Sequence, residues 1–312
     1  MNQQIPIDKS PGPINDSAGI IAGWSTRPMA CASRANALTV DVEDYFQVEA
    51  FAGLIDREQW QSYECRVERN VERILALFEK SGATATFFTL GWIAKRHPAV
   101  IRQIVDAGHE LASHGTMHYR AAGQSPEVFR EDIVSAKTLL EDLSGVEVKG
   151  YRAPSFSITR ETLWILDELE QAGYRYSSST YPIHHDLYGI PEAPRFAFRP
   201  FETRAFLEIP VTTARLFNTN LPCGGGGYFR LLPYWWSSFG LNRVRRADKQ
   251  PCMFYFHPWE IDPDQPRIPG ASLKTRVRHY TNLGRMEKRL AKLLGKFDWQ
   301  RIDRVYPIPQ EG

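Results

Sequence analysis

The sequence contains few cysteines, and none has the spacing of a metal ribbon or a disulfide framework. Only four occur in 312 residues, and they lie far apart, at Cys31, Cys65, Cys223 and Cys252. Without a CxxC pair, neither a zinc ribbon nor a dense disulfide scaffold is expected. Reduced thiols in the cytoplasm are the simplest interpretation.

The sequence also lacks a large excess of charge of one sign and long apolar runs. The net charge is +2, and lysines and arginines are not massed in blocks, which argues against nucleic acid as the main partner. No apolar run approaches the roughly 20 residues that span a bilayer. The apolar patch at 18–24 has too little upstream positive charge for a good signal peptide. We expect a cytoplasmic protein in which residues 1–35 are a disordered leader, or in which translation starts nearer Met29.

What the sequence does contain is a regular alternation of strand-like and helical segments. Strand-like runs occur at 37–41, 84–89, 110–113, 146–151, 174–177, 205–211 and 252–257. Helical periodicity between them is clearest at 67–78, 92–107, 128–143 and 159–172. About seven β/α repeats predict an α/β fold, either a barrel or a doubly wound sheet. No Gly-rich phosphate-binding turn follows the first strand, which argues against a doubly wound sheet that binds a dinucleotide.

Charged and polar side chains follow four of these strands at the point where each strand ends. They are Asp41 and Asp44 in ALTVDVEDYF, His114 and His118 in SHGTMH, Arg152 in YRAPSF, and His257 in FYFHPWE. In parallel β/α folds the carboxyl ends of the strands carry the active site. We therefore expect these side chains on one rim of the fold.

The spacing His114-x-x-x-His118 would let two imidazoles face one metal ion, although two surface or capping histidines would give the same spacing. An HExxH site is not present, because Gly115 occupies the position of its glutamate. A carboxylate at a neighbouring strand end favours the metal site. Two histidines and one carboxylate leave positions open for water, as catalytic sites do.

These motifs, in this order, resemble the polysaccharide deacetylases of the NodB-homology, carbohydrate esterase 4 group. The stretches TVDVEDYFQVEAF, GGGGYFRLLPYW, YFHPWEIDPDQPR and RHYTNL are similar to a subfamily linked to bacterial exopolysaccharide loci with an exosortase system. The resemblance covers residues 37–307. It implies a distorted (β/α) barrel of about seven strands, in agreement with the repeats, and places that domain at 36–308.

The resemblance also implies a metal-dependent hydrolase that removes N-acetyl groups from N-acetylhexosamine units of a glycan. Its cofactor would be one divalent ion, with Zn²⁺ favoured, held by Asp44, His114 and His118. The family motif has adjacent aspartates, whereas Val42 and Glu43 intervene here. Strand alternation would turn Glu43 to the side of Asp41, and a loop could then swing Asp44 inward; Glu43 is the alternative ligand.

Catalytic roles follow from the same resemblance. Asp41 would be the general base, held ionised by a charge-assisted hydrogen bond from Arg152. His257 would be the acid that protonates the leaving amine. The backbone N–H near Ser155 would lie in the oxyanion hole, and Tyr228 would contact the sugar.

One departure from the family pattern concerns the acid that usually orients the catalytic histidine. Ser177 stands where an aspartate is expected, and Asp186 and Glu260 are the candidate substitutes. Two alternative functions therefore stay open. One is a catalytically weakened paralogue that still binds glycan, and the other is a related hydrolase of small amides such as allantoin.

Three further features have plainer interpretations. Gly224 to Gly227 are predicted to form a flexible loop, because Tyr228 stands where a P-loop has lysine. The His184-His185 pair is typical of a solvated turn. The basic segment 274–292 is predicted to be a helix with a solvated face, weakly attracted to anionic glycan or membrane headgroups.

Overall fold

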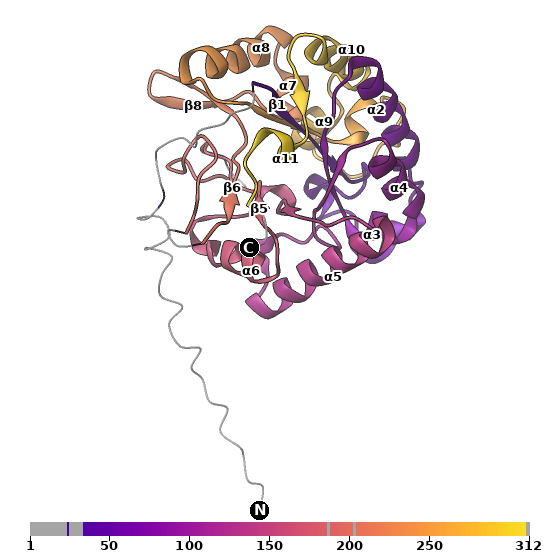
Figure 1. The fold of residues 1–312 in the computed structure, drawn as a ribbon. Coiled ribbons are helices and arrows are strands. Elements are labelled where there is room, and N and C mark those ends of the chain that lie inside the picture. Colours follow the sequence, from indigo (N-terminus) through magenta and orange to yellow (C-terminus); the bar gives the residue numbers. More distant parts are fainter. Residues whose placement is uncertain (1–23, 25–33, 186–187, 202–203, 310–312) are drawn as a thin grey trace, which may run out of the picture.

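A parallel sheet curls into an incomplete barrel, and helices cover its outside (Figure 1). The computed structural model describes residue 24 and residues 34–185, 188–201 and 204–309. The strands of the sheet are β1 (Asn36–Val42), β2 (Thr86–Thr89), β3 (Glu110–Ser113), β4 (Gly150–Tyr151), β5 (Tyr176–Ser177), β6 (Leu207–Glu208), β9 (Met253–Phe256) and β10 (Trp299–Gln300). All seven predicted strands are therefore present, some of them shorter than predicted.

The strand order explains why the barrel is distorted. The sheet runs β10-β1-β2-β3-β4-β5-β6, and β9 pairs with β1 in parallel, with Ala37 opposite Met253. No ladder joins β6 to β9 within the described ranges, so the barrel stays open there. The chain between them instead forms an antiparallel hairpin, β7 (Thr213–Leu216) and β8 (Thr219–Pro222), which the strand pattern did not predict.

The helices follow the predicted periodicity with two exceptions. They are α2 (Val67–Ser81), α3 (Gly91–Arg96), α4 (Pro98–Asp106), α5 (Pro126–Ser144), α6 (Trp164–Gln171), α7 (Gly226–Leu231), α8 (Tyr234–Arg243), α9 (Leu273–Tyr280), α10 (Leu283–Leu294) and α11 (Ile302–Val305). The predicted helix at 92–107 is two helices, because Pro98 lacks an N–H and disfavours helical geometry at His97. The basic segment 274–292 is also broken, at Asn282, which is left-handed at φ 61°.

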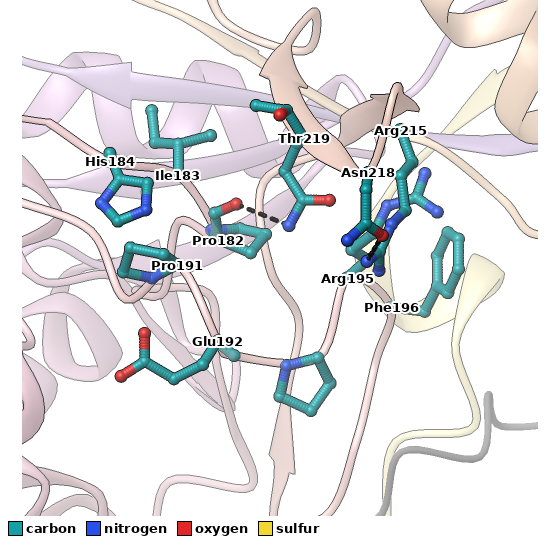
Figure 2. A pocket seen from close by; sticks show the side chains of 13 residues that line it. Pro182, Ile183, His184, Pro191, Glu192, Arg195, Phe196, Arg215, Asn218 and Thr219 are labelled. Atoms are coloured by element: carbon teal, nitrogen blue, oxygen red, sulfur yellow. Dashed lines mark hydrogen bonds between the residues drawn. The ribbon is translucent and has the colours of Figure 1, made fainter.

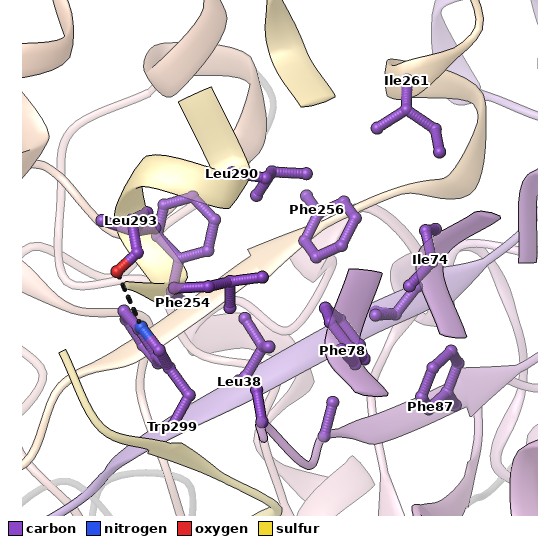
Figure 3. Packing of buried hydrophobic residues seen from close by; sticks show 14 of the residues in the cluster. Leu38, Ile74, Phe78, Phe87, Phe254, Phe256, Ile261, Leu290, Leu293 and Trp299 are labelled. Carbon is purple, nitrogen blue, oxygen red and sulfur yellow. Dashed lines mark hydrogen bonds between the residues drawn. The ribbon is translucent and has the colours of Figure 1, made fainter. Parts of the chain in front are cut away.

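Strand β1 is buried on both faces, and its two faces have different roles. Leu38 and Val40 pack outward against α2 and α10, in a cluster with Phe78, Phe254 and other large apolar side chains (Figure 3). The alternate residues Thr39 and Asp41 are also buried, and both contact Arg152 on the inner side. The period-two alternation of a strand thus directs the polar set inward and the apolar set toward the helices.

The predicted leader falls almost wholly outside the described residues. The exceptions are Trp24, Arg34 and Ala35. Trp24 and Ala35 are buried, and the Trp24 ring lies 4.7 Å, centroid to centroid, from the ring of Phe198. The leader at 1–35 stays a prediction, and Trp24 and Ala35 are the described residues of it that pack against the domain. Among the described residues, no helix is both long and apolar enough to cross a bilayer.

Candidate active site

Asp41, at the end of β1, is held by Arg152, which follows β4. Arg152 is completely buried and donates hydrogen bonds to Asp41 Oδ1, to Thr39 Oγ1 (2.9 Å) and to the Ser178 carbonyl (3.0 Å). Its guanidinium also lies 4.1 Å from the centroid of the Phe88 ring. A buried charge pair of this kind fixes both side chains, because each needs the other to offset its lost hydration.

A second buried cluster joins Glu43 to His114 and His118. One ligand-type atom from each of the three lies within 4.8 Å of the others, and His118 Nε2 is 2.9 Å from Glu43 Oε2. The turn between the histidines depends on Gly115, which has φ 73° and where a Cβ would lie 2.8 Å from Asp132 Oδ2. Glycine tolerates this conformation, and the turn brings His118 back beside His114.

The charges of this cluster suit metal binding. Burial alone would raise the pKa of Glu43, but the adjacent His118 and His257 outweigh it and lower that pKa to about 2. Burial lowers the pKa of His114 to about 4, so its imidazole is neutral at pH 7. His114 Nδ1 lies 2.8 Å from the Arg152 carbonyl, which can only accept a hydrogen bond. The His114 Nδ1–H therefore donates there and leaves Nε2 with its lone pair free for a ligand bond.

Two imidazoles and one carboxylate form a donor set that fits a divalent ion such as Zn²⁺. In the described part of the chain, the residues that could hold such an ion are Glu43, His114 and His118. Trp259, which is not one of the three donors, orients the Glu43 carboxylate, because its indole N–H donates to Glu43 Oε1 at 3.1 Å.

Asp44 is not part of this cluster, which corrects the expectation that it completes the metal site. Its Oδ2 accepts the backbone N–H groups of Arg66 (2.5 Å) and Val67 (3.0 Å), and its Oδ1 accepts that of Tyr45. Arg66 is the N-cap of α2 and Val67 is its first residue, and N–H groups at this end lack partners within the helix. Asp44 therefore caps a helix, and strand alternation carries Glu43 inward beside Asp41.

The two neighbouring acids should respond differently to mutation. Glu43→Gln removes a charged ligand, so we expect the metal content to fall sharply while the fold is retained. Asp44→Asn should keep the metal but lose stability by about 1–3 kcal/mol, because an amide nitrogen cannot accept a buried N–H. Elemental analysis and thermal unfolding of both variants test this. Metal loss in Asp44→Asn alone would contradict the assignment.

His257, at the end of β9, faces both carboxylates at the strand ends. Its Nε2 lies 3.9 Å from Asp41 Oδ2 and 3.6 Å from Glu43 Oε1. Its Nδ1 lies 2.8 Å from Glu260 Oε1. Burial lowers the pKa of His257, but the negative charges of Glu43, Glu260 and Asp41 more than offset this and raise it to about 9.

Of the candidates that the sequence left open, Glu260 is the acid that contacts His257. The turn Pro258–Ile261 places Glu260 three residues after His257 and on the same side. Arg230 from α7 donates to the other Glu260 oxygen at 3.2 Å. Ser177 instead hydrogen-bonds Ser179 (2.7 Å between hydroxyls), and Asp186 lies outside the described residues.

The glycine run at the start of α7 is tightly packed at Gly225 and Gly226, not the flexible loop that was predicted. A Cβ at Gly226 would lie 2.3 Å from Glu260 Oε2, and one at Gly225 would lie 2.6 Å from the Tyr255 ring. Gly227 by contrast has nothing within 4 Å of an added Cβ. The run is needed so that α7 can approach β9 and carry Arg230 to Glu260.

Several residues of this site were not predicted from the sequence. Trp259 stacks between His257 (ring centroids 5.2 Å apart) and the buried His279 (4.2 Å). Arg230 pairs with Glu260 from a different part of the chain. For the contact between Glu260 and His257 the sequence does give a local signal, the spacing in HPWE. A glutamate three residues after a histidine lies on the same side of a helical turn.

The two predicted substrate contacts lie near this rim. Ser155 is left-handed (φ 57°, ψ 24°) in the turn Pro154–Phe156, and its N–H donates to none of the described residues. Tyr228 is half-buried in α7. The pKa of Tyr255 is raised well above its ordinary value by burial first, and the nearby Asp41 and Tyr228 add to this.

A further groove lies away from these clusters. It has a volume of about 540 Å³ and is lined by residues 182–184 and 191–196 and by the β7–β8 hairpin (Figure 2). His184 lines it, together with Arg195 and Asn220. None of the acids or histidines of the two buried clusters takes part, so the groove is separate from the candidate active site.

Comparison with known proteins divides the chain into two matched segments. Residues 56–177 match the family model described as polysaccharide deacetylase, and residues 178–307 match a domain of unknown function, DUF3473. A peptidoglycan deacetylase from Helicobacter pylori is 29% identical over 120 residues, which are 38% of this chain and 39% of that protein. A chitooligosaccharide deacetylase from Azorhizobium caulinodans is 28% identical over 97 residues, 31% of this chain and 46% of that protein.

The chain thus spans less than half the length of these two curated relatives. Among solved structures, a protein from Mycobacterium smegmatis described as a polysaccharide deacetylase aligns with a TM-score of 0.56 and 18% identity. That alignment covers 88% of this chain and 89% of the other. At this identity the likeness supports the (β/α) barrel fold alone.

Proposed function

Residues 56–177 of this chain belong to the polysaccharide deacetylase family, and from that premise we propose that the protein is a metal-dependent glycan N-deacetylase. It would remove acetyl groups from N-acetylhexosamine units. The observation that carries the proposal is the convergence on one rim of Glu43, His114 and His118 with the Asp41–Arg152 pair and His257. On the similarity of its sequence stretches to those of exopolysaccharide loci, we further propose an extracellular polysaccharide as the glycan.

The reaction needs a stronger electrophile and a stronger nucleophile than an amide and water at neutral pH. A divalent ion held by Glu43, His114 and His118 would polarise the acetyl carbonyl and lower the pKa of water. Asp41 is suited to accept the proton of the attacking water. Arg152 holds its Oδ1, and its Oδ2 is the oxygen 3.9 Å from His257 Nε2.

The remaining residues act on the oxyanion and on the leaving group. The Ser155 N–H, fixed by the left-handed turn, is a donor for the negative oxygen that develops from the carbonyl. His257 gives its Nε2 proton to the amine as the C–N bond breaks, while Glu260 holds the opposite nitrogen. The products are acetate and a glycan with a free amine.

The Glu260 contact favours an active enzyme over the weakened paralogue. A carboxylate 2.8 Å from His257 Nδ1 restores what Ser177 cannot supply, namely orientation and charge for an imidazolium. No observation favours the small-amide hydrolase. Acetate release from N-acetylglucosamine oligomers, measured beside a small amide such as allantoin, tests the choice of substrate directly.

Metal content provides the first test of the site. We expect about one divalent ion per chain, since Glu43, His114 and His118 form one cluster of three donors. His114→Ala with His118→Ala should empty it and abolish acetate release. The matched control is His184→Ala with His185→Ala, which removes two histidines outside the cluster. Full metal occupancy in the first double variant, by elemental analysis, would refute the assignment.

A further inference from the structure

Helix α8 lies on the outside of the molecule (Figure 1). It has two large aromatic side chains that are exposed to solvent. Trp235 is 61% exposed and Phe239 is 48% exposed. They are four residues apart, so they share one face of the helix. Exposed aromatic side chains grouped on one face of an element are typical of an interaction surface.

These aromatics line a groove that is bordered by positive charge. The groove has a volume of about 470 Å³ and lies between α8, the segment that follows it, and the end of α10. Its lining consists of Tyr234, Trp235, Ser238, Phe239, Asn242, Arg246, Lys292 and Lys296. Three of these residues are cations and none is an acid. No carboxylate of the described residues forms an ion pair with Arg246, Lys292 or Lys296, so the positive charge of the groove is not neutralised from within.

The polar groups in the groove are poorly suited to sugar hydroxyls. Ser238 Oγ accepts a hydrogen bond from Lys296 Nζ at 2.5 Å, and Asn242 Nδ2 donates to the Ser238 carbonyl at 2.8 Å. Lys292 Nζ lies 4.5 Å from the centroid of the Tyr234 ring, with its charge still at the edge of the groove. What the groove offers a partner is therefore apolar aromatic surface and positive charge.

We propose that the groove formed by α8 and α10 is a docking surface for a membrane that contains anionic lipids. Trp235 and Phe239 would enter the headgroup region, where aromatic side chains are favoured, and the three cations would meet lipid phosphates. A second exposed apolar pair, Leu273 and Val277 on α9, lies beside basic residues too. The α8 groove is the surface we propose, because its exposed aromatics and three cations line one hollow.

Vesicle co-sedimentation of the full chain tests the proposal. We expect binding to vesicles of equal parts phosphatidylcholine and phosphatidylglycerol, and little binding to phosphatidylcholine alone. Lys292→Gln with Lys296→Gln should weaken binding by about fivefold per removed charge. Trp235→Ala with Phe239→Ala should reduce it to the level seen with neutral vesicles.

Matched controls separate this surface from general charge and hydrophobicity. Lys80→Gln with Lys95→Gln removes two exposed lysines elsewhere, and Phe217→Ala removes an aromatic that is 93% exposed at the hairpin tip; both should bind like the wild type. Thermal unfolding checks that each variant is folded.

Three outcomes would overturn the proposal. The first is a wild-type protein that stays in the supernatant with both vesicle types. The second is binding that is lost in Leu273→Ala with Val277→Ala but kept in the α8 variants. The third is Trp235-dependent binding to a soluble polyuronate without vesicle binding, which would make the groove a glycan surface.

Discussion

Replacing Asp41 by Asn is expected to lower kcat by about 10²- to 10⁴-fold, the usual contribution of a general base. The amide keeps the shape of the carboxylate but cannot accept the proton of water. Metal content should stay near that of the wild type, because Glu43, His114 and His118 are the residues placed to hold the ion. Acetate release per folded molecule, with elemental analysis of the same sample, is the measurement.

Asp41 also has a structural contact, so stability must be measured beside turnover. Arg152 is buried and would lose its charged partner, which commonly costs about 3–5 kcal/mol of folding free energy. Thr39→Val is the matched control, because it removes another Arg152 contact (2.9 Å) and leaves the carboxylate in place. It should lower the melting temperature with a loss in kcat below about tenfold, well short of a lost general base. An Asp41→Asn protein with near wild-type kcat would disprove the general-base role.

Much of the fold could be predicted because its signals are local. The alternation of strands and helices, read from periodicity, gave seven strands that the structure contains. The rim could be predicted as well, since parallel strands end at one edge. Asp41, His114, Arg152 and His257 come from four different strands and lie together for that reason.

The incorrect predictions concern contacts between distant parts of the chain. Asp44 was chosen as a ligand because nothing near it in sequence shows that the N-terminus of α2, 22 residues later, needs a cap. The glycine run looked flexible because its neighbours, Tyr255 and Glu260, come from β9 and the turn after it. Local patterns carry periodicity and turn chemistry, but close approach of two segments depends on tertiary packing.

The second large effect is expected at Glu260, which positions His257 without touching the substrate. Glu260→Gln keeps the size of the side chain but removes the charge 2.8 Å from His257 Nδ1. We expect kcat to fall by about 10²-fold, the lower end of the range for a general acid that loses its orientation. The Arg230 guanidinium would then lack a full counter-charge, so melting temperature should fall too.

The pH profile distinguishes positioning from a purely structural role. His257 must be protonated to act as an acid, and its raised pKa, about 9, means that activity should decline as pH rises through that value. Removing the Glu260 charge lowers this pKa, so the alkaline limb of the profile should move to lower pH. A Glu260→Gln enzyme with reduced kcat and an unshifted alkaline limb would contradict this role.

The positioning role of Glu260 can also be tested by steric displacement, with an alanine at Gly226. The same substitution at the neighbouring Gly227 is the control. A Cβ at Gly226 would lie 2.3 Å from Glu260 Oε2, whereas one at Gly227 meets nothing within 4 Å. Both residues lie at the start of α7, so helix propensity changes in the same direction in Gly226→Ala and Gly227→Ala. Gly226→Ala should displace Glu260 and reproduce both the loss in kcat and the shifted alkaline limb, and Gly227→Ala should do neither. Equal effects of the two substitutions would mean that α7 itself, and not the Glu260–His257 contact, limits the reaction.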